Sequence, residues 1–439
     1  MKKLLLLITF LIDLSCAHAA DIYDPKTNQL KIESVLLGQT TYSNVVINVG
    51  NVVSVGSGVA NGTVDLYNSL NNQLIIPSVN SSIGNYTNVV VTVGSVVSVG
   101  GASNVKLPLA NGFTVSLWSY RSHGETVNSL TAMKNLTGAN SIVVDFQLMT
   151  SSLTGNDIRI YQSLTQLTDV LQTAKSLGFD VWFKPLVMVG DVNGLNWQQL
   201  APTDPQLWFN NYTSVLNQIA PILQTQGVSN FLITNELSSM TTHPAYTNYW
   251  ANLIAALKKN FTGKIGFNAG GLLGGNSSDN EFLNIPKATL SLLDFMGISA
   301  YPRLMSAQTY TVDSVLAAWR QDYFKNNDEA LVRSFSTSNP SIPLYFTELG
   351  NNAYYGGNLS ATSSPDPISN KAFVQGSLKE ITTNLPKING TFFYNWTLNT
   401  TQGAVTTGGP FNVYSWDYYC KPEMYSVFNS FWTNVLYRQ

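Results

Sequence analysis

From residue 111 to the end of the chain, short apolar runs alternate with helical stretches. This alternation constrains the fold most, because alternating strands and helices build a parallel sheet that helices cover. Eight such units in roughly 330 residues fit a (β/α)₈ barrel, a TIM barrel of the α/β class, with enlarged loops. The strands are predicted at residues 113–118, 141–148, 180–187, 230–234, 264–268, 295–300, 343–347 and 391–395.

Helices are predicted between these strands, and several of them have clear end signals. Asp204 is expected to cap a helix whose first residue is Pro205, a position that favours proline. Gly178 follows Leu177 and tolerates the left-handed conformation that ends many helices. The predicted helices are residues 125–135, 164–177, 204–224, 247–260, 312–326 and 369–382.

Two of the predicted strands lead directly into a glutamate. Residues 231–237 read FLITNEL and residues 343–348 read PLYFTE, so Glu236 and Glu348 each follow an apolar run. In a (β/α)₈ barrel the C-terminal strand ends carry the active site, and charged groups there are costly to bury unless they are used. Two such carboxylates can cleave a glycoside, one by protonating the leaving oxygen and one by attacking the sugar. The alternative is that each is only a salt-bridged or exposed side chain.

Five segments of the barrel region form a recognisable series: residues 167–185 (LTDVLQTAKSLGFDVWFKP), Trp208-Phe209, 234–237 (TNEL), 296–302 (MGISAYP) and 346–350 (FTELG). Their order and spacing resemble glycoside hydrolase family 113, whose known members are β-mannanases and belong to a large clan of retaining (β/α)₈ enzymes. The resemblance implies that Glu236 is the acid/base and Glu348 the nucleophile. Leu186 and Asn235 depart from the family pattern, which has histidine after Lys-Pro and Gly-Thr-Glu-Leu around the acid/base, and they leave the substrate open.

The two roles require opposite protonation of the carboxyl groups. The acid must start protonated, in a site that raises its pKa, and the nucleophile must be ionised and hydrogen-bonded. We expect Tyr301 to donate to Glu348 and Asn235 to bind the 2-hydroxyl of the sugar. Trp396 is expected either to form the floor under the sugar or to pack in the core. Further side chains at or after strand ends are expected, as a group, to line the substrate site: Trp118, Arg121, Lys184, Trp197 and Trp416.

The first residues are predicted to form a signal peptide. Lys2 and Lys3 precede an apolar run at residues 4–12 that is too short to span a bilayer, and residues 17–19 (AHA) supply the small residues of a cleavage site. We therefore expect residues 1–19 to be removed and the protein to be secreted, periplasmic or at the cell surface.

The number and spacing of the cysteines and histidines argue against a metal site and a disulfide. Cys16 permits a lipoprotein interpretation, although Asp13 stands where a lipobox has leucine. Once the signal peptide is cleaved, Cys420 is the only cysteine, which excludes an internal disulfide and a cysteine zinc site. His123 and His243 have no metal-ligand spacing, and no cofactor is expected.

Residues 20–110 are predicted to form a separate β-rich region before the hydrolase domain, residues 111–439. Residues 42–56 (YSNVVINVGNVVSVG) recur 44 positions later as residues 86–100 (YTNVVVTVGSVVSVG). Because each copy is rich in valine and contains glycine, we expect each to form two strands joined by a tight Val-Gly turn. The repeats are expected to be either a β spacer or a module that contacts carbohydrate or the cell envelope.

The composition disfavours nucleic acid as a partner. Of the 439 residues, 44% are hydrophobic and 11% are charged, and the net charge is −2. Such a surface cannot bind a polyanion strongly, because that affinity comes from Lys and Arg displacing counterions. A neutral carbohydrate is the expected partner, and the protein is expected to be a monomer.

These patterns together predict a secreted glycoside hydrolase that acts on β-linked polysaccharide or oligosaccharide, with β-1,4-mannan favoured by the resemblance. One alternative is a non-catalytic carbohydrate-binding surface protein on a barrel scaffold, since folds can outlive activities. Another is a hydrolase of the same clan that acts on β-glucan or galactan. The choice of backbone and of endo or exo cutting depends on loops that sequence patterns do not define.

Overall fold

The protein is described from a computed structural model and divides into two compact units, the first ending at Leu107 and the second covering Pro108–Thr433. Among the described residues, no helix is long and apolar enough to span a membrane. The structure describes residues 21–37, 40–56, 65–68, 72–98, 101–104, 110–190, 197–271, 280–302, 310–321, 327–350, 367–385, 387–398, 418 and 422–433.

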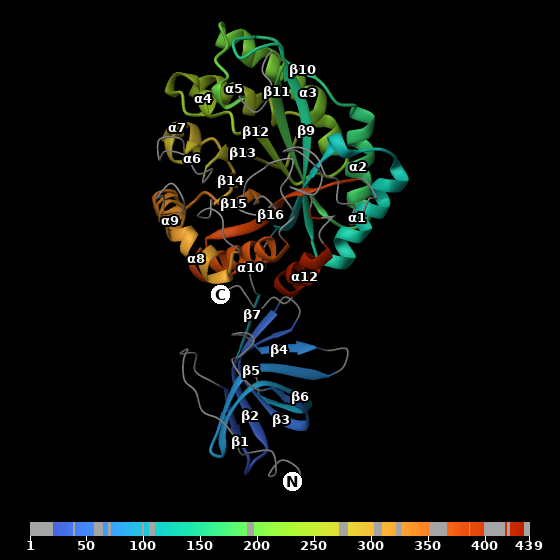
Figure 1. Cartoon of the computed structure of the whole chain (residues 1–439), viewed down its shortest axis with the longest axis vertical. Coiled ribbons are helices and arrows are strands. Elements are labelled where there is room, and N and C mark those ends of the chain that lie inside the picture. Colours follow the sequence, from blue (N-terminus) through green and yellow to red (C-terminus); the bar gives the residue numbers. More distant parts are fainter. Residues whose placement is uncertain are drawn as a thin grey trace. The chain divides into compact units, whose positions relative to one another are not determined.

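The second unit is a closed barrel of eight parallel strands, as predicted (Figure 1). Each strand pairs with the next in the chain, and the last pairs with the first to close the barrel. A two-residue strand, β10 (Arg159–Ile160), adds antiparallel to β9. The barrel strands are β8 (Ala110–Ser116), β9 (Ser141–Thr150), β11 (Asp180–Val189), β12 (Asn230–Asn235), β13 (Lys264–Gly270), β14 (Phe295–Ala300), β15 (Leu344–Leu349) and β16 (Ile388–Trp396).

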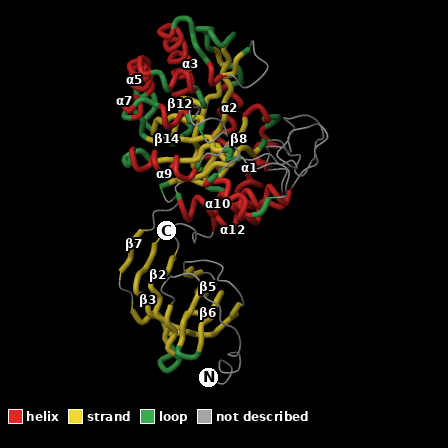
Figure 2. The backbone as a smooth tube through the Cα atoms, turned by 60° about the vertical axis from the view of Figure 1, so that its left-hand side comes forward, coloured by secondary structure: helices red, strands yellow, loops and turns green. Residues whose placement is uncertain are grey.

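Helices surround these strands (Figure 2). The Asp204 side chain accepts a hydrogen bond from the Leu207 backbone N–H at 3.0 Å, and Gly178 has a φ of 76°, so both predicted end signals are confirmed. The predicted helices correspond to α1 (His123–Thr137), α2 (Leu164–Ser176), α3 (Pro205–Thr225), α5 (Thr247–Leu257), α8 (Val312–Arg320) and α10 (Pro367–Asn384). Helices without a sequence prediction are α4 (Ser238–Thr241), α6 (Glu281–Asn284), α7 (Lys287–Leu290), α9 (Asp328–Ser338) and α12 (Tyr425–Thr433).

An aromatic plug fills part of the barrel interior and determines which side chains face inward. The Trp182 ring lies 4.8 Å from that of Tyr345 and 5.2 Å from that of Phe295, measured between centroids. Because side chains alternate along a strand, Lys184, two residues after Trp182 on β11, also points into the barrel. A larger apolar layer packs between the outside of the strands and the helices.

The first unit is a seven-stranded sheet in the order β1-β2-β4-β5-β6-β3-β7, with further pairings β1–β5 and β2–β3. The predicted Val-Gly turns are wrong, because residues 42–56 of the first copy lie in one continuous strand and residues 86–98 of the second copy lie in another. A Cβ atom on Gly50 would lie 2.5 Å from the Thr92 hydroxyl oxygen, so this glycine permits two paired strands to approach each other closely. The strands are β1 (Asp21–Asp24), β2 (Gln29–Leu37), β3 (Thr40–Gly56), β4 (Asp65–Asn68), β5 (Gln73–Ser81), β6 (Gly84–Ser98) and β7 (Gly101–Asn104).

The structural duplication is longer than the repeat seen in the sequence. The Tyr23 hydroxyl donates to Asn28 Oδ1 at 2.9 Å, and 44 positions later the Tyr67 hydroxyl donates to Asn72 Oδ1 at 2.8 Å. Both asparagines have a positive φ, 56° and 54°. The duplicated element therefore starts before the valine-rich segments, at the first described strand of each half.

Asp21 on β1 and Asp65 on β4 are equivalent in this duplication, are both buried and hydrogen-bond each other. Burial, and then the charge of Asp21, raise the pKa of Asp65 to about 9. Since an unfolded aspartate has a pKa of about 3.9, the folded unit binds more protons between these values. The contribution of this carboxyl group to stability is therefore fully present below about pH 4 and is lost as the pH rises toward 9.

We expect Asp65→Asn to remove most of this loss and to raise the unfolding midpoint of the first unit at pH 8 by on the order of several degrees. Scanning calorimetry at pH 4, 6 and 8 measures the effect. Asp24→Asn is the matched control, because that residue is only half-buried and local hydrogen bonds lower the pKa of its carboxyl group. The explanation fails if Asp65→Asn and the unchanged protein lose stability in parallel between pH 4 and 8.

Candidate active site

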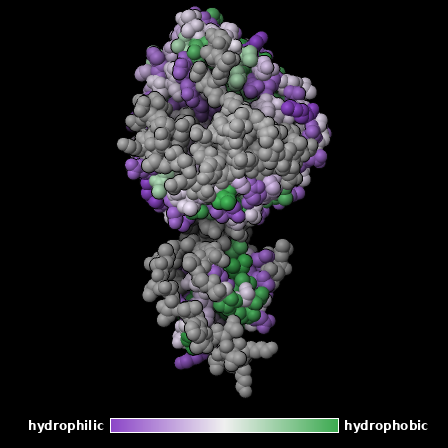
Figure 3. Space-filling model, in the orientation of Figure 1, coloured by the Kyte–Doolittle hydropathy of each residue, from purple (hydrophilic) through white to green (hydrophobic). Residues whose placement is uncertain are grey.

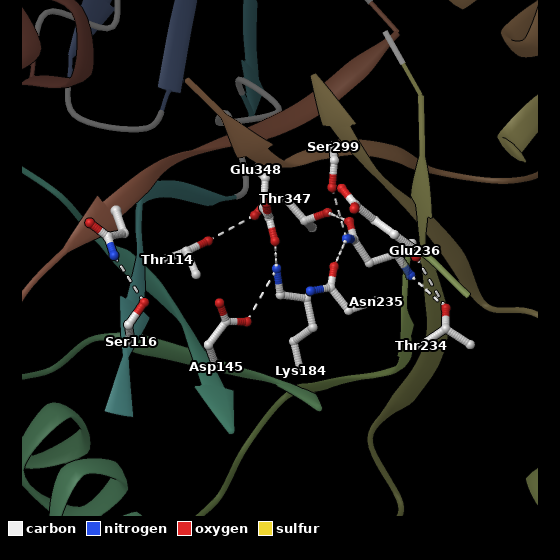
Figure 4. A network of polar contacts seen from close by, with 12 residues as sticks. Thr114, Ser116, Asp145, Lys184, Thr234, Asn235, Glu236, Ser299, Thr347 and Glu348 are labelled. Atoms are coloured by element: carbon white, nitrogen blue, oxygen red, sulfur yellow. Dashed lines mark hydrogen bonds and ion pairs between the residues drawn. The ribbon is translucent and has the colours of Figure 1, made fainter. Parts of the chain in front are cut away.

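Glu236 and Glu348 lie at the C-terminal ends of β12 and β15 and are 6% exposed (Figure 4). Glu348 pairs in register with Ser299 of β14, and the Ser299 hydroxyl hydrogen-bonds the Glu236 carboxyl. Strands that are far apart in the sequence thus bring the two carboxyl groups to one end of the barrel, where (β/α)₈ enzymes hold their reacting groups.

Glu348 receives a hydrogen bond on each carboxyl oxygen. The Lys184 ammonium donates to Oε1, and the Tyr301 hydroxyl donates to Oε2 at 2.8 Å, which confirms the contact expected for Tyr301. An ammonium and a hydroxyl together are the donors that an ionised carboxylate needs in a buried site. Glu348 is therefore equipped to carry a negative charge.

Glu236 has the opposite environment. Burial, followed by the negative charge of Glu348, raises the pKa of Glu236. Hydrogen bonds from Ser299 and from Gln198, whose Nε2 lies 3.0 Å from Glu236 Oε2, oppose this shift without reversing it. The protonated form of Glu236 is thus favoured relative to an exposed glutamate, as a general acid requires.

Lys184 was predicted to line the substrate site, and the structure corrects this prediction. The side chain is fully buried, and its ammonium lies 3.2 Å from Asp145 Oδ1 on β9, in addition to its contact with Glu348 (Figure 4). Burial lowers the pKa of Lys184, but the two carboxylates outweigh burial and raise it overall. The ammonium is buried between the two carboxylates and is not exposed on the surface of the site.

Sequence reasoning missed Asp145, although a charge inside the apolar run 141–148 was a signal. Asp145 is the register partner of Lys184 on the neighbouring strand. Burial raises the pKa of Asp145 to about 7, against the attraction of Lys184. Asp145 provides Lys184 with a second carboxyl neighbour inside the barrel.

Asn235 is held in a buried amide and hydroxyl network. Its Oδ1 accepts from Asn268 Nδ2, which also lies 3.0 Å from the Ser299 hydroxyl oxygen, and Asn268 Oδ1 accepts from Thr347. The network links strands β12 to β15 directly beneath the two glutamates. The contact expected between Asn235 and the sugar stays a prediction. In that contact the side-chain amide nitrogen of Asn235 would be the donor.

The barrel region matches a known protein family. Residues 111–413 match the model of glycoside hydrolase family 113. The chain belongs to this family. It is therefore a glycoside hydrolase of the clan that the sequence motifs resemble.

Solved structures agree with this assignment at the level of the fold. A family 113 β-1,4-mannanase aligns with a TM-score of 0.58 and 17% identity, covering 74% of this chain and 99% of its own. The family 113 β-mannanase of Alicyclobacillus acidocaldarius aligns with a TM-score of 0.58 and 16% identity, covering 74% and 98%. None of the curated proteins matches the chain in sequence.

Trp396 does not form a floor in this family 113 hydrolase. The side chain is completely buried, its indole N–H donates to the Ser129 hydroxyl on α1 at 2.9 Å, and its ring centroid lies 4.9 Å from that of Phe113. Trp396 therefore packs between the barrel wall and the helices, as the core alternative proposed.

A register shift explains the orientation of Trp396. Tyr394 is paired with Thr114, whereas Trp396 is paired with Val115, so Asn395 is an extra residue on β16. An extra residue reverses the alternation of side chains that follow it. Trp396 consequently points outward, although the spacing from Tyr394 would otherwise place both on the inner face.

Tyr394 was missed by the sequence prediction and faces the site. Its ring centroid lies 6.4 Å from that of Tyr301. Burial first, and then the charges of Asp145 and Glu348, raise the pKa of Tyr394, so these groups are close neighbours. Its spacing from the inward-facing Phe392 was the available signal.

The other side chains expected to line the substrate site have different surroundings, and their contact with substrate stays a prediction. Trp118 is 41% exposed in the 3₁₀ helix η1 (Leu117–Ser119), and Arg121 donates to the backbone carbonyls of Trp118 at 3.2 Å and Tyr120 at 3.0 Å. Trp197, in the 3₁₀ helix η2 (Trp197–Gln199), is buried in the apolar layer. Trp416 lies outside the described residues. Within the described ranges, no three His, Cys, Asp or Glu side chains gather as a metal site requires.

Proposed function

We propose that this family 113 enzyme is a retaining glycosidase that cleaves β-linked polysaccharide, with β-1,4-mannan as the substrate class. The observation that carries the proposal is the opposite environment of the two carboxyl groups. Glu348 binds an ammonium and a hydroxyl, while burial and the charge of Glu348 raise the pKa of Glu236. Carboxyl groups that differ in this way can divide the roles of nucleophile and general acid.

The proposed reaction has two steps. Glu348 attacks the anomeric carbon as the bond to the leaving oxygen breaks, and that oxygen takes the proton of Glu236. In the second step water gives a proton to Glu236 and attacks the anomeric carbon, which releases Glu348. Lys184 and Tyr301 hold Glu348 in the orientation required for attack and stabilise its charge before and after the covalent stage.

The choice of mannan is supported by the family and by the two mannanase structures with the same fold. The test is release of reducing ends from galactomannan, glucomannan, β-glucan and galactan, with the configuration of the first product followed by NMR. We expect the fastest release from mannan backbones, and a first product with the β configuration. An initial α product would overturn retention, and faster release from β-glucan would overturn the substrate.

Controls separate this proposal from the non-catalytic alternative. Glu236→Gln and Glu348→Gln are expected to abolish release of reducing ends, because each removes one of the two carboxyl groups. Glu380→Gln is the matched control, since Glu380 is also fully buried but lies on α10, where it contacts Arg320 and Asn384. A protein that binds mannan but releases no sugar would be the carbohydrate-binding surface protein.

We also propose that the chain is an exported monomer whose first unit contacts carbohydrate or the cell envelope. This contact is supported by exposed valines on two strands that contain no charged residue, β3 and β6, and Figure 3 shows green hydrophobic surface on this unit. N-terminal sequencing of the exported protein tests cleavage after Ala19, and light scattering tests the monomer. The exposed valines are Val52, Val53, Val55, Val96 and Val97.

Lysine substitutions test the contact of the first unit. Val53→Lys combined with Val97→Lys should weaken co-sedimentation with insoluble mannan or envelope fragments while leaving activity on soluble oligosaccharide unchanged. The charges replace apolar surface of the first unit and leave the sequence of the barrel unchanged. Unchanged sedimentation would leave the first unit as a spacer.

A further inference from the structure

Glu281, the first residue of α6, provides a third buried carboxyl group beside the proposed active site. It is 1% exposed. Its Oε2 accepts from the Gly270 backbone N–H at 2.6 Å and from the Ser238 hydroxyl at 3.0 Å, and its Oε1 accepts from the Thr241 hydroxyl. The two-step reaction proposed above does not use this carboxyl group.

Glu281 contacts two segments next to Glu236: the helix that follows it in the chain and the strand that pairs with it. The two hydroxyls belong to α4, which begins two residues after Glu236. Gly270 ends β13, and the carbonyl of Asn268 on the same strand accepts the Glu236 backbone N–H at 2.9 Å. Glu281 therefore links α4, which follows Glu236 in the chain, to β13, which accepts the Glu236 backbone N–H.

Glu236 occupies a backbone conformation that needs such support. Its φ is 53°, in the left-handed region that residues with a Cβ atom rarely adopt. A residue persists in this region only where its surroundings hold it, and such residues concentrate at active sites. The turn determines where the Glu236 carboxyl points.

Both glutamates lie next to Gly270. A Cβ atom on Gly270 would lie 3.3 Å from Glu281 Oε2 and 3.6 Å from both Cβ and Cγ of Glu236. The Glu281 carboxyl and the Glu236 side chain thus border the same small space. A shift of Glu281 would be transmitted to Glu236 through α4 and through β13.

We propose that Glu281 is a positioning residue that holds Glu236 in its left-handed turn and so directs the acid/base toward the leaving oxygen. The inference rests on the proposed function. Burial raises the pKa of Glu281 to about 8, which fits a group that acts through hydrogen bonds more than through charge. Glutamine can replace it, because an amide oxygen can accept from Gly270 and an amide NH₂ can donate to Thr241.

The test compares Glu281→Ala with Glu281→Gln on two substrates of different leaving groups. A misplaced general acid slows the cleavage of a poor leaving group most. We expect Glu281→Ala to lower kcat/KM on mannan oligosaccharide on the order of a hundredfold. On an aryl mannoside with an activated leaving group the loss should be at most about threefold, because little protonation is needed there. Glu281→Gln should restore most of the activity on both.

Two further variants exclude general damage as the cause. Thr241→Val removes one of the contacts with little change in shape and should give a smaller loss of the same selectivity. Glu380→Ala removes a buried carboxyl on α10 and should lower both activities equally, if at all. Equal losses on the two substrates for Glu281→Ala would overturn the positioning role.

A crystal structure of Glu281→Ala decides the inference independently of activity. Relaxation of the Glu236 φ out of the left-handed region, or displacement of its carboxyl, supports the positioning role. An unmoved Glu236 overturns it. If the unchanged protein releases no sugar from any polysaccharide, the proposed function fails, and this structure still decides whether Glu281 holds the turn.

Discussion

Glu348→Ala should lower kcat/KM on the order of a thousandfold or more on every substrate, which is roughly 4 kcal/mol of transition-state stabilisation. Without the carboxylate no glycosyl-enzyme can form, whatever the leaving group. The variant also leaves the Lys184 ammonium with only one carboxylate neighbour, Asp145, in a buried site. Kinetics on mannan and on an activated aryl mannoside measure the loss.

Product configuration gives a second measurement for Glu348→Ala. Added azide can replace the nucleophile only by attacking from the face that Glu348 occupied, so the glycosyl azide should have inverted configuration. A fluorinated glycoside should label Glu348 in the unchanged protein. Labelling of Glu236 instead would reverse the two assignments, and a loss of less than about tenfold would remove Glu348 from the mechanism.

Glu236→Ala should be far more damaging on natural polysaccharide than on an activated aryl glycoside. A general acid contributes most when the leaving group is poor, and this contribution is typically 10²- to 10⁴-fold. On the activated substrate, azide should restore turnover by attacking the glycosyl-enzyme from the space that the side chain leaves. The resulting glycosyl azide should have retained configuration, opposite to that of Glu348→Ala.

The pH profile provides an independent check on Glu236. Because burial and the charge of Glu348 raise its pKa, the unchanged enzyme should lose kcat/KM as the pH rises through the pKa of Glu236 and the acid is deprotonated. This alkaline limb should disappear for Glu236→Ala on the activated substrate. If the limb persists unchanged, another group supplies the proton.

Local sequence patterns were sufficient to locate the strands of the barrel and its two glutamates. A buried parallel strand is a short apolar run with turn residues at its ends. Both signals lie within the strand or directly beside it in the sequence. The position after such a run places Glu236 and Glu348 at one end of the barrel, because all eight strands are parallel. Neither conclusion needs a partner strand to be known.

Side-chain surroundings depended on pairing between distant segments, and only the tertiary structure decided them. The sequence predicts that Lys184 is a cation at the end of a strand. In the structure it pairs in register with Asp145, contacts Glu348 and is completely buried. The same is true of Trp396, whose direction follows from one extra residue in the pairing of β16 with β8.

Two further features were equally non-local. Gly50 and Gly94 permit a close approach of the paired strands β3 and β6, which one copy alone cannot reveal. Glu281 is 45 positions from Glu236 in the chain and meets it only because β13 returns beside β12. The periodicity of the sequence indicates on which face of its own strand or helix a residue lies. The register between strands and the paths of the loops determine which other residues that face contacts.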